Sequence, residues 1–367
     1  MLPIISVIMP NYNTPLEYLE KAVNSILTQT FYDFEFIIID DCSTDDSYSF
    51  LRSLDDKRIK LVRNKENLGV TASLNVGLDI AVGEYIARMD SDDISLPERF
   101  ERQLKYMNAH KDVIVCGTFA EEIGDRNGKR CRKIPNMEEY QCGVLFGNVF
   151  GLIHPTAFFR AEELRKNHIR YDENIKTAQD YAMWATCVRY GRISNVEEVL
   201  FQYRIHGKQI SSEKKDIQKR CTMYTMKQQL LHIIPDITDE EVQLHYEYCI
   251  TNNISLEMKK WFGRIITANS ECKYVNEEEL SKFVDMFIQG KINAASMTAN
   301  SPGKLIRLFF ASGLKEKRVI LNNILKRVSR RIPLMRLECG ETVFSKLKNI
   351  IYNFKLRKSS GGGDFNN

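Results

Sequence analysis

Residues 84–93 read EYIARMDSDD, an apolar stretch that runs directly into three carboxylates within four residues. Its apolar part is short and contains β-branched and aromatic side chains, which is typical of a buried strand. Two earlier stretches have the same form: residues 35–41 read EFIIIDD, and residues 4–13 read IISVIMPNYN. Each of the three predicted strands therefore ends in polar side chains that can reach a ligand.

Helical patterns separate these strands along the first 120 residues. We expect strands at 4–9, 35–39, 59–63, 84–89 and 113–119, and helices between them at 16–27, 43–54, 70–82 and 96–109. This alternation predicts an α/β fold, in which a mostly parallel sheet carries helices on both faces. Ligands of such sheets bind beyond the carboxyl ends of the strands, so three polar strand ends predict a ligand site there.

The remainder of the chain changes character twice. Residues 120–212 are irregular and rich in glycine, and from 213 the pattern is helical, with helices expected at 216–232, 239–251, 255–268 and 276–289. From 303 the chain is basic and amphipathic, and it ends in SSGGGDFNN. We therefore predict an α/β domain at 1–212, a helical extension at 213–302, a basic segment at 303–358 and a flexible tail at 359–367.

The composition is that of an ordinary enzyme without a membrane-spanning segment. No apolar run reaches the length of a transmembrane helix, and the start of the chain lacks the basic region of a signal peptide. The nine cysteines are scattered and form no CxxC pair. They are expected to be reduced thiols of a cytoplasmic protein rather than disulfide partners or zinc ligands.

The net charge of +4 is unevenly distributed. Residues 304–358 contain fifteen Lys or Arg and three Glu, a net of +12, so the remaining residues sum to 4 − 12 = −8. Within this segment, residues 315–332 place apolar side chains near helical spacing among basic ones. That pattern predicts a helix on an anionic membrane surface; the alternative is a helix packed on the acidic body. Few aromatic residues interleave with the charge, so nucleic-acid binding is not expected.

The acidic turn is the first candidate for chemistry. Asp90, Asp92 and Asp93 repel one another and are costly to bury without a cation. Oxygen ligands suit Mg²⁺ or Mn²⁺, which would neutralise the charge on a departing diphosphate. The alternative is a solvated acidic turn that caps the next helix.

Several other polar residues have two interpretations. Asp41 can accept a hydrogen bond from a base or a ribose, or it can complement a helix N-terminus. Asp180, at a predicted helix start, can be a general base or an N-cap. His154 and His206 can contact a ligand, although a single histidine is more often packed. Arg204 and His206 lie two residues apart and share a face if the segment is extended, so they can reach a diphosphate together.

Three stretches of the chain carry a family resemblance. PIISVIMPNYN (3–13), ILTQTFYDFEFIIIDDCSTDDS (26–47) and KENLGVTASLNVGLDIAVGEYIARMDSDDISLPERFERQL (65–104) arrive in the order and spacing of glycosyltransferase family 2. The resemblance covers about residues 3–210 and implies the GT-A fold, which is Rossmann-like. It also implies an inverting hexosyl- or N-acetylhexosaminyltransferase that uses a nucleotide sugar, usually UDP-linked, with Mn²⁺ or Mg²⁺.

Roles for single residues follow from this resemblance by position. Tyr12 would stack on the base and Asp41 would accept from it, within a nucleotide-binding set of Pro10, Tyr12, Asn13, Asp41, Arg63, Asn67 and Asp90. Asp92 would be the direct metal ligand, with Asp90 and His206 beside it. Asp180 would be the catalytic base. The family usually has Glu-Asp there, whereas this chain has Gln179 before the base. Trp184 would lie near the acceptor, its alternative being a core tryptophan, and Arg204 and His154 are further candidates for contact with the acceptor or diphosphate.

The resemblance also suggests a place of action. The acceptor would be a saccharide, or a saccharide on a polyprenyl diphosphate, in the synthesis of a surface polysaccharide such as capsule or O-antigen, at the inner face of the cell membrane. Two alternatives stay open: a sugar nucleotidyltransferase and a non-catalytic protein that binds sugar nucleotides. The former would need a glycine-rich basic loop after the first strand, where this chain has Asn-Tyr-Asn-Thr-Pro.

Overall fold

The computed structural model describes residues 2–149, 151–207, 215–250 and 255–298. The chain divides into two compact units, Met1–Ile288 and Gln289–Asn367, and the contacts described below lie within the first. The predicted basic segment and tail fall outside the described residues. The domain boundaries expected at 212 and 302 stay predictions.

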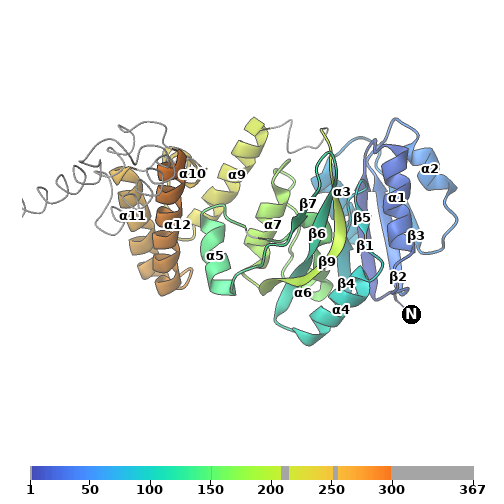
Figure 1. Ribbon diagram of the computed structural model, residues 1–367, viewed down its shortest axis with the longest axis horizontal. Coiled ribbons are helices and arrows are strands. Elements are labelled where there is room, and N and C mark those ends of the chain that lie inside the picture. The colour runs from blue at the N-terminus through green and yellow to red at the C-terminus, as the bar shows by residue number, and fades with distance from the viewer. Residues whose placement is uncertain (1, 150, 208–214, 251–254, 299–367) are drawn as a thin grey trace, which may run out of the picture. The chain divides into compact units, whose positions relative to one another are not determined.

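The first half of the sheet is built from the predicted parallel strands (Figure 1). They lie in the order β3-β2-β1-β4 and comprise β1 (Ile5–Asn11), β2 (Phe34–Asp40), β3 (Ile59–Arg63) and β4 (Tyr85–Arg88). In the register Asn11 pairs with Asp40, and Asp40 pairs with Arg63. The polar carboxyl ends of these strands therefore lie level at one edge.

The second half of the sheet makes it mixed. The order continues β8-β6-β9-β5, with β7 beside β6. Because β8 is antiparallel to both β4 and β6, strands β6 and β9 run in the same direction as β1 to β4. The bounds are β5 (Ile94–Ser95), β6 (Val113–Gly124), β7 (Gly128–Arg130), β8 (Phe158–Arg160) and β9 (Arg192–Ile205). The α/β prediction with a mostly parallel sheet is confirmed, but β8 and β9 arise from a stretch that was expected to be irregular.

Helices cover both faces of the sheet. Ile5, Val7 and Met9 of β1 point into a core shared with α1 and α4, whereas Ile8 points to the opposite face. There α3 packs so closely that a Cβ on Gly77 would lie 2.4 Å from Cγ2 of Ile8. The helices of this domain are α1 (Leu16–Leu27), α2 (Ser47–Ser53), α3 (Val70–Ile80), α4 (Arg99–Ala109), α5 (Met137–Leu145), α6 (Ala161–Lys166) and α7 (Gln179–Cys187), with a 3-10 turn at His154–Thr156.

The predicted start of α2 was wrong by four residues. Ser43 does not cap the helix, because its N–H donates to Asp40 and its hydroxyl accepts from Asn11 and from the N–H of Asn13. Cys42 has a φ of 63°, which turns the chain away from a helical path. The loop after β2 is thereby tied to the loop after β1, and the helix begins at Ser47.

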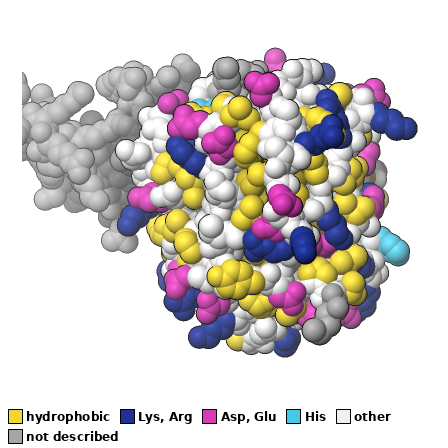
Figure 2. Space-filling view, turned by 90° about the vertical axis from the view of Figure 1, so that its right-hand side faces the viewer, with side chains coloured by type: hydrophobic (Ala, Val, Ile, Leu, Met, Phe, Trp, Pro, Cys, Tyr) yellow, Lys and Arg dark blue, Asp and Glu magenta, His cyan; other side chains and the backbone are white. Residues whose placement is uncertain are grey.

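Four helices follow the sheet: α9 (Lys215–Leu230), α10 (Asp239–Ile250), α11 (Leu256–Cys272) and α12 (Glu277–Thr298). They correspond to the four predicted helices, although α12 extends to Thr298 rather than 289. Hydrophobic and charged side chains are interspersed on the face shown in Figure 2. Within the described ranges, no helix combines the length and the apolarity that crossing a bilayer requires.

Candidate active site

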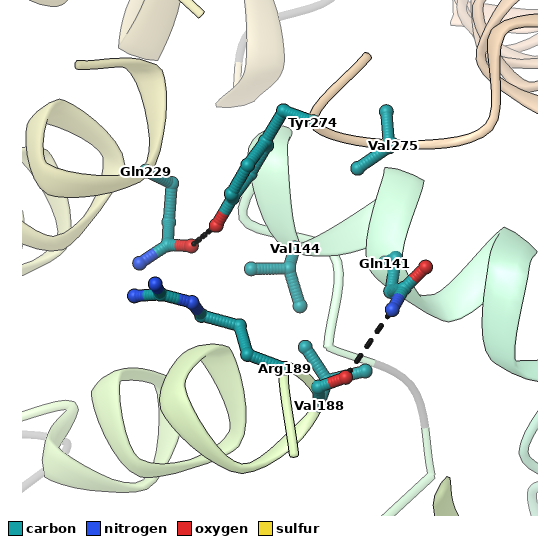
Figure 3. Close-up of a pocket in the computed structure, with 7 residues that line it drawn as sticks. All are labelled: Gln141, Val144, Val188, Arg189, Gln229, Tyr274 and Val275. Atoms are coloured by element: carbon teal, nitrogen blue, oxygen red, sulfur yellow. Dashed lines mark hydrogen bonds between the residues drawn. The ribbon is translucent and has the colours of Figure 1, made fainter. Parts of the chain in front are cut away.

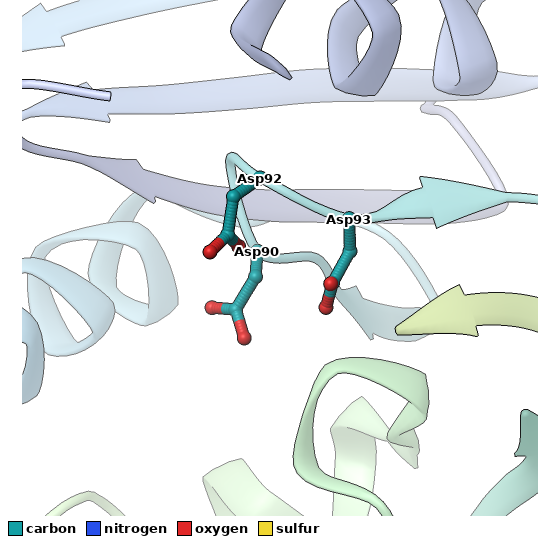
Figure 4. A group of neighbouring side chains, drawn as sticks. All are labelled: Asp90, Asp92 and Asp93. Atoms are coloured by element: carbon teal, nitrogen blue, oxygen red, sulfur yellow. The ribbon is translucent and has the colours of Figure 1, made fainter. Parts of the chain in front are cut away.

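The acid turn is the centre of the candidate site, and we define it as Asp90, Asp92 and Asp93. It follows β4 directly, and its three side chains point to the same side of the chain (Figure 4). One oxygen from each residue lies within 4.8 Å of the others. Asp93 is buried, and burial together with its acidic neighbours raises its pKa well above the usual range. The turn therefore concentrates negative charge where water cannot fully solvate it.

Two buried arginines lie next to the acid turn. Arg88 pairs with one of its carboxylates, and Arg99 binds the backbone of Arg88. Arg88 holds the Asp90 carboxylate with Nη1 at 2.6 Å and Nη2 at 2.5 Å, although its side chain is only 5% exposed. Arg99 donates from Nη2 to the Arg88 carbonyl at 2.8 Å and from Nε to Gln103 at 2.9 Å. Burial lowers the pKa of Arg99 to about 9, which still leaves it protonated at neutral pH. The sequence offered one signal that was missed: Arg88 interrupts an otherwise apolar strand.

The end of β9 lies against the acid turn. His206 Nε2 is 2.8 Å from Asp92 Oδ2. Arg204 donates its backbone N–H to Asp93 Oδ1 and its Nε to the carbonyl of Asp92, both at 2.7 Å. Tyr18 of α1, which sequence reasoning missed, lies under the Arg204 guanidinium at 4.2 Å from ring centroid to Cζ. Arg204 and His206 thus meet the same turn from an extended strand.

The donor set of the acid turn fits a divalent cation. Asp93 Oδ2 is buried and has no hydrogen-bond partner among the described residues. Carboxylate oxygens with one imidazole nitrogen suit Mn²⁺ or Mg²⁺. Arg88 already occupies both oxygens of Asp90, so Asp92, beside His206, is the more available ligand.

Asp180 lies in the first turn of α7. Ala178 precedes it in the left-handed region (φ 57°, ψ 29°) and turns the chain into the helix. Burial raises the pKa of Asp180, while the N–H of Tyr181, which donates to Oδ1 at 2.8 Å, opposes that shift. The charge of Asp180 also raises the pKa of Asp90, and the charge of Arg88 lowers that of Asp180. Asp180 therefore interacts electrostatically with Asp90 of the acid turn.

Trp184 and His154 are buried next to each other in the core. Trp184 is 1% exposed, stacks on Phe159 at 5.9 Å and meets the His154 ring edge-on at 5.8 Å. His154 Nε2 is 2.8 Å from the Tyr171 hydroxyl, and burial lowers the pKa of His154 well below its usual range. Through these contacts Trp184 packs α7, the helix that carries Asp180, against β8 and the 3-10 turn. Their predicted contact with an acceptor stays a prediction.

Asp41 organises the loop before α3. Its Oδ1 accepts from Asn64 Nδ2 at 2.7 Å and from the Leu68 N–H at 2.9 Å, and its Oδ2 accepts from the Gly69 N–H at 2.8 Å. Gly69 has a φ of 86°, where a side chain would be strained. Asn67, within this loop, is exposed. By accepting from two backbone N–H groups, Asp41 thus holds the loop before α3, which we expect to line the nucleotide site.

The loop after β1 joins the predicted nucleotide side to the acid turn. Pro10 is buried, whereas Tyr12 is 48% exposed and offers a ring face. Asn13, at a φ of 49°, accepts the Thr44 N–H at 2.8 Å. The Thr14 hydroxyl lies 2.7 Å from that of Ser91, inside the turn. The tips of β1 and β4 are therefore neighbours.

Arg63 is engaged by its own surroundings. Its guanidinium lies 3.9 Å from the Tyr48 ring centroid, donates to the Ser43 carbonyl at 3.0 Å and approaches Asp40 Oδ2 at 3.4 Å. It holds the loop after β2 in shape, and its predicted contact with a nucleotide is not tested by these bonds.

Comparisons with known proteins identify the family of this chain. A sequence profile described as "Glycosyl transferase family 2" matches residues 6–167. An uncharacterised glycosyltransferase of Haemophilus influenzae is 35% identical over 225 residues, covering 57% of this chain and 68% of the relative. The putative teichuronic acid biosynthesis glycosyltransferase TuaG of Bacillus subtilis is 30% identical over 238 residues, covering 63% and 91%.

Solved structures share the architecture. The crystal structure of S. aureus TarS 1–349 in complex with UDP-GlcNAc has a TM-score of 0.53 at 19% identity, covering 88% of this chain and 91% of that one. At this identity the likeness extends to the fold alone. The family profile includes the acid turn and Asp41 but ends before Asp180, Arg204 and His206.

Proposed function

Because this chain belongs to glycosyltransferase family 2, we propose that it transfers a sugar from a UDP-linked donor to a hydroxyl group of a saccharide, with inversion at the anomeric carbon. One observation carries the proposal: the acid turn, with oxygens within 4.8 Å of one another, lies beside His206, and the charge of Asp180 acts on Asp90. A candidate cation site and a candidate base would thus serve the same reaction.

The donor would bind along the tips of β1 and β2. The exposed ring of Tyr12 is available to stack on a base, and the loop held by Asp41 would line the pocket with Pro10, Asn13, Arg63 and Asn67. TarS, which shares this fold, has been solved with UDP-GlcNAc, which supports a UDP-linked donor. The identity of the sugar is a matter for measurement.

Asp92 and His206, with Asp90, would hold Mn²⁺ or Mg²⁺. When bound, the metal supplies positive charge that stabilises the departing diphosphate. Arg204, anchored on the turn and on Tyr18, adds a cation on the same side. Arg88 neutralises Asp90, so the charge of this carboxylate is balanced even where it does not face the cation.

Asp180 would act as the general base. Its raised pKa makes it a better proton acceptor than an exposed carboxylate. It would remove the proton of the acceptor hydroxyl as the oxygen forms a bond to the anomeric carbon. The bond from that carbon to the diphosphate breaks on the opposite face, and its electron pair leaves with UDP. One displacement inverts the configuration and needs no second carboxylate nucleophile.

The acceptor would be a saccharide, free or on a polyprenyl diphosphate, in surface polysaccharide synthesis. The name of TuaG, which refers to teichuronic acid biosynthesis, supports this class of product. The net charge of +12 in residues 304–358 supports a position at an anionic inner membrane face.

A donor panel tests the proposal. Purified protein is incubated with UDP-GlcNAc, UDP-glucose, UDP-galactose and GDP-mannose in Mn²⁺, in Mg²⁺ and in EDTA, and release of the nucleoside diphosphate is measured. We expect slow hydrolysis of one UDP-sugar with metal and none in EDTA. UDP binding without turnover of any donor, in the presence of saccharide acceptors, would contradict the proposal and favour a non-catalytic binder.

A further inference from the structure

A cavity lined by none of the acid-turn residues is shown in Figure 3. It has a volume of about 210 Å³ and is lined by Gln141, Val144, Val188, Arg189, Gln229, Tyr274 and Val275. These residues come from α5, the end of α7, α9 and the turn before α12. Asp180 is at one end of α7 and Arg189 follows the other, so at 1.5 Å per residue they are about 13 Å apart along the axis.

Arg189 brings an unbalanced positive charge to this cavity. Its Nη1 lies 3.4 Å from His232 Nε2, and burial together with the Arg189 charge lowers the pKa of His232. A histidine carries no negative charge in either protonation state, so His232 does not compensate the guanidinium. Across the described ranges, no carboxylate comes within ion-pair distance of Arg189. A cation at a cavity wall without an acid favours an anionic ligand.

Gln229 adds a second donor beside it. The Tyr274 hydroxyl donates to Gln229 Oε1 at 2.9 Å, which directs the amide nitrogen toward Arg189 (Figure 3). Gln229 is only 7% exposed, so its amide is held in one orientation by the surrounding helices. An oxyanion between Arg189 and Gln229 would receive hydrogen bonds from both.

The opposite wall is apolar. Val144, Val188 and Val275 line the cavity together with Arg189 and Gln229. Gln141 donates to the Val188 carbonyl at 3.2 Å. The volume is below the roughly 300–1,000 Å³ of pockets for drug-sized ligands, so it suits one sugar ring rather than an oligosaccharide. A sugar acid or a sugar phosphate combines the anion and the apolar ring face that these walls match.

We propose that this cavity binds a small molecule that carries an oxyanion, a carboxylate or a phosphate, on a body the size of one sugar. The site goes beyond the transfer reaction, because its ligand would lie at the far end of α7 from Asp180. A bound ligand would bridge α5, α7 and α9 and stabilise their packing. Native-state binding of this kind raises the unfolding temperature.

Three probes test this site on the full chain in EDTA, which removes metal-dependent binding at the acid turn. D-glucuronate, inorganic phosphate and D-glucose are titrated separately by isothermal calorimetry and by thermal unfolding. We expect at least one anion to bind and to raise the unfolding temperature, while glucose does neither. Tighter glucuronate identifies a carboxylated sugar as the ligand class, and tighter phosphate identifies a phosphate group.

Two variants and a control decide the assignment. Arg189→Gln is expected to weaken anion binding at least tenfold, and Gln229→Glu to abolish it by placing a carboxylate next to Arg189. Arg52→Gln, an exposed arginine on α2, should leave binding unchanged. Equal binding of glucose and glucuronate, absence of binding by either anion, or anion binding that Arg189→Gln leaves intact would overturn the proposal. Donor hydrolysis is expected to persist in Arg189→Gln, so failure here is distinct from failure of the transferase assignment.

Discussion

The carboxylate of Asp90 is held by both terminal nitrogens of Arg88, at 2.6 and 2.5 Å, although the arginine comes from a buried strand. The neighbouring Asp92 instead faces His206 at 2.8 Å. Two acids that are two residues apart are therefore in different electrostatic surroundings. Asp90 is neutralised by the protein, and Asp92 is the carboxylate that we propose as the ligand of a cation.

Arg88→Gln should destabilise the fold and impair transfer. Removing one partner of a buried ion pair leaves an uncompensated charge, so the free energy of unfolding should fall by about 3 kcal/mol. Arg88→Lys keeps a charge but cannot hold Asp90 with two nitrogens, so it should lose less stability yet still lower kcat. Urea unfolding and donor turnover measure the two effects. A glutamine variant as stable and active as wild type would show that the contact has no role.

Asp92→Asn should abolish metal-dependent transfer in a protein that stays folded. The change removes the negative charge of the most available ligand, so turnover in Mn²⁺ should fall about a hundredfold or more, as for loss of other transition-state electrostatic contacts. Calorimetric Mn²⁺ titration, circular dichroism and donor turnover check the three parts. Glu20→Gln, an exposed acid on α1, is the matched control. Unchanged turnover in Asp92→Asn would overturn the metal assignment.

Local patterns were sufficient to predict the first half of the sheet. A parallel strand buried on both faces appears in the sequence as a short apolar run, and its end is marked by the first polar residues. For this reason β1, β2 and β4 were found with their polar tips, and the meeting of those tips followed from the geometry of parallel sheets. The same reasoning located Asp90 and Asp92 on one turn.

Long-range contacts account for what was missed. Strand β9 pairs with β6 through a ladder with register shifts, so neither its length nor its bend has a regular sequence pattern. Tyr18 reaches Arg204 across 186 positions of the chain (204 − 18), and only the fold makes them neighbours. The Arg88 pairing with Asp90 is local, but an arginine in an apolar strand does not indicate its partner. The cavity beside Arg189 depends on four segments and has no sequence motif.

Asp180→Asn should lose transfer but keep UDP binding. The amide is nearly isosteric with the carboxylate but cannot take the acceptor proton, whereas the predicted nucleotide site lies at the tips of β1 and β2. Turnover with acceptor and UDP titration by calorimetry separate the two steps. If transfer persists at the wild-type rate, the base lies elsewhere; if UDP binding is lost as well, Asp180 also shapes the donor site.

Asp41→Ala should weaken both the fold and nucleotide binding. Three donors, from Asn64, Leu68 and Gly69, lose their acceptor, and two of them are backbone N–H groups in the loop before α3. Unsatisfied buried donors are expected to lower the free energy of unfolding by about 2 kcal/mol. UDP affinity should fall because the loop loses its fixed shape. Asp46→Asn, an exposed acid nearby, should change neither quantity.

His245 should make stability fall in acid. Its Nδ1 accepts from Trp261 Nε1 at 3.0 Å, so Nε2 carries the proton and donates to the Leu145 carbonyl at 2.9 Å. Burial lowers the pKa of His245 to about 4 in the folded protein. The unfolded chain, with a pKa of about 6.5, binds the proton first between these values. Stability is therefore full above pH 6.5 and decreases as pH falls toward 4, by up to about 3 kcal/mol.

Comparison with His245→Gln isolates this contribution. Glutamine can donate and accept but does not titrate, while the other ionisable groups, including buried His154, remain in both proteins. Urea unfolding at pH 4.5, 5.5, 6.5 and 7.5 gives the free energy of unfolding of each. The free energy of unfolding should fall more between pH 6.5 and 4.5 in wild type than in the variant. Only wild type has a group at this position whose pKa is lower in the folded than in the unfolded chain. Parallel pH curves would mean that the pKa of His245 is the same in the folded and the unfolded chain, which would contradict the prediction.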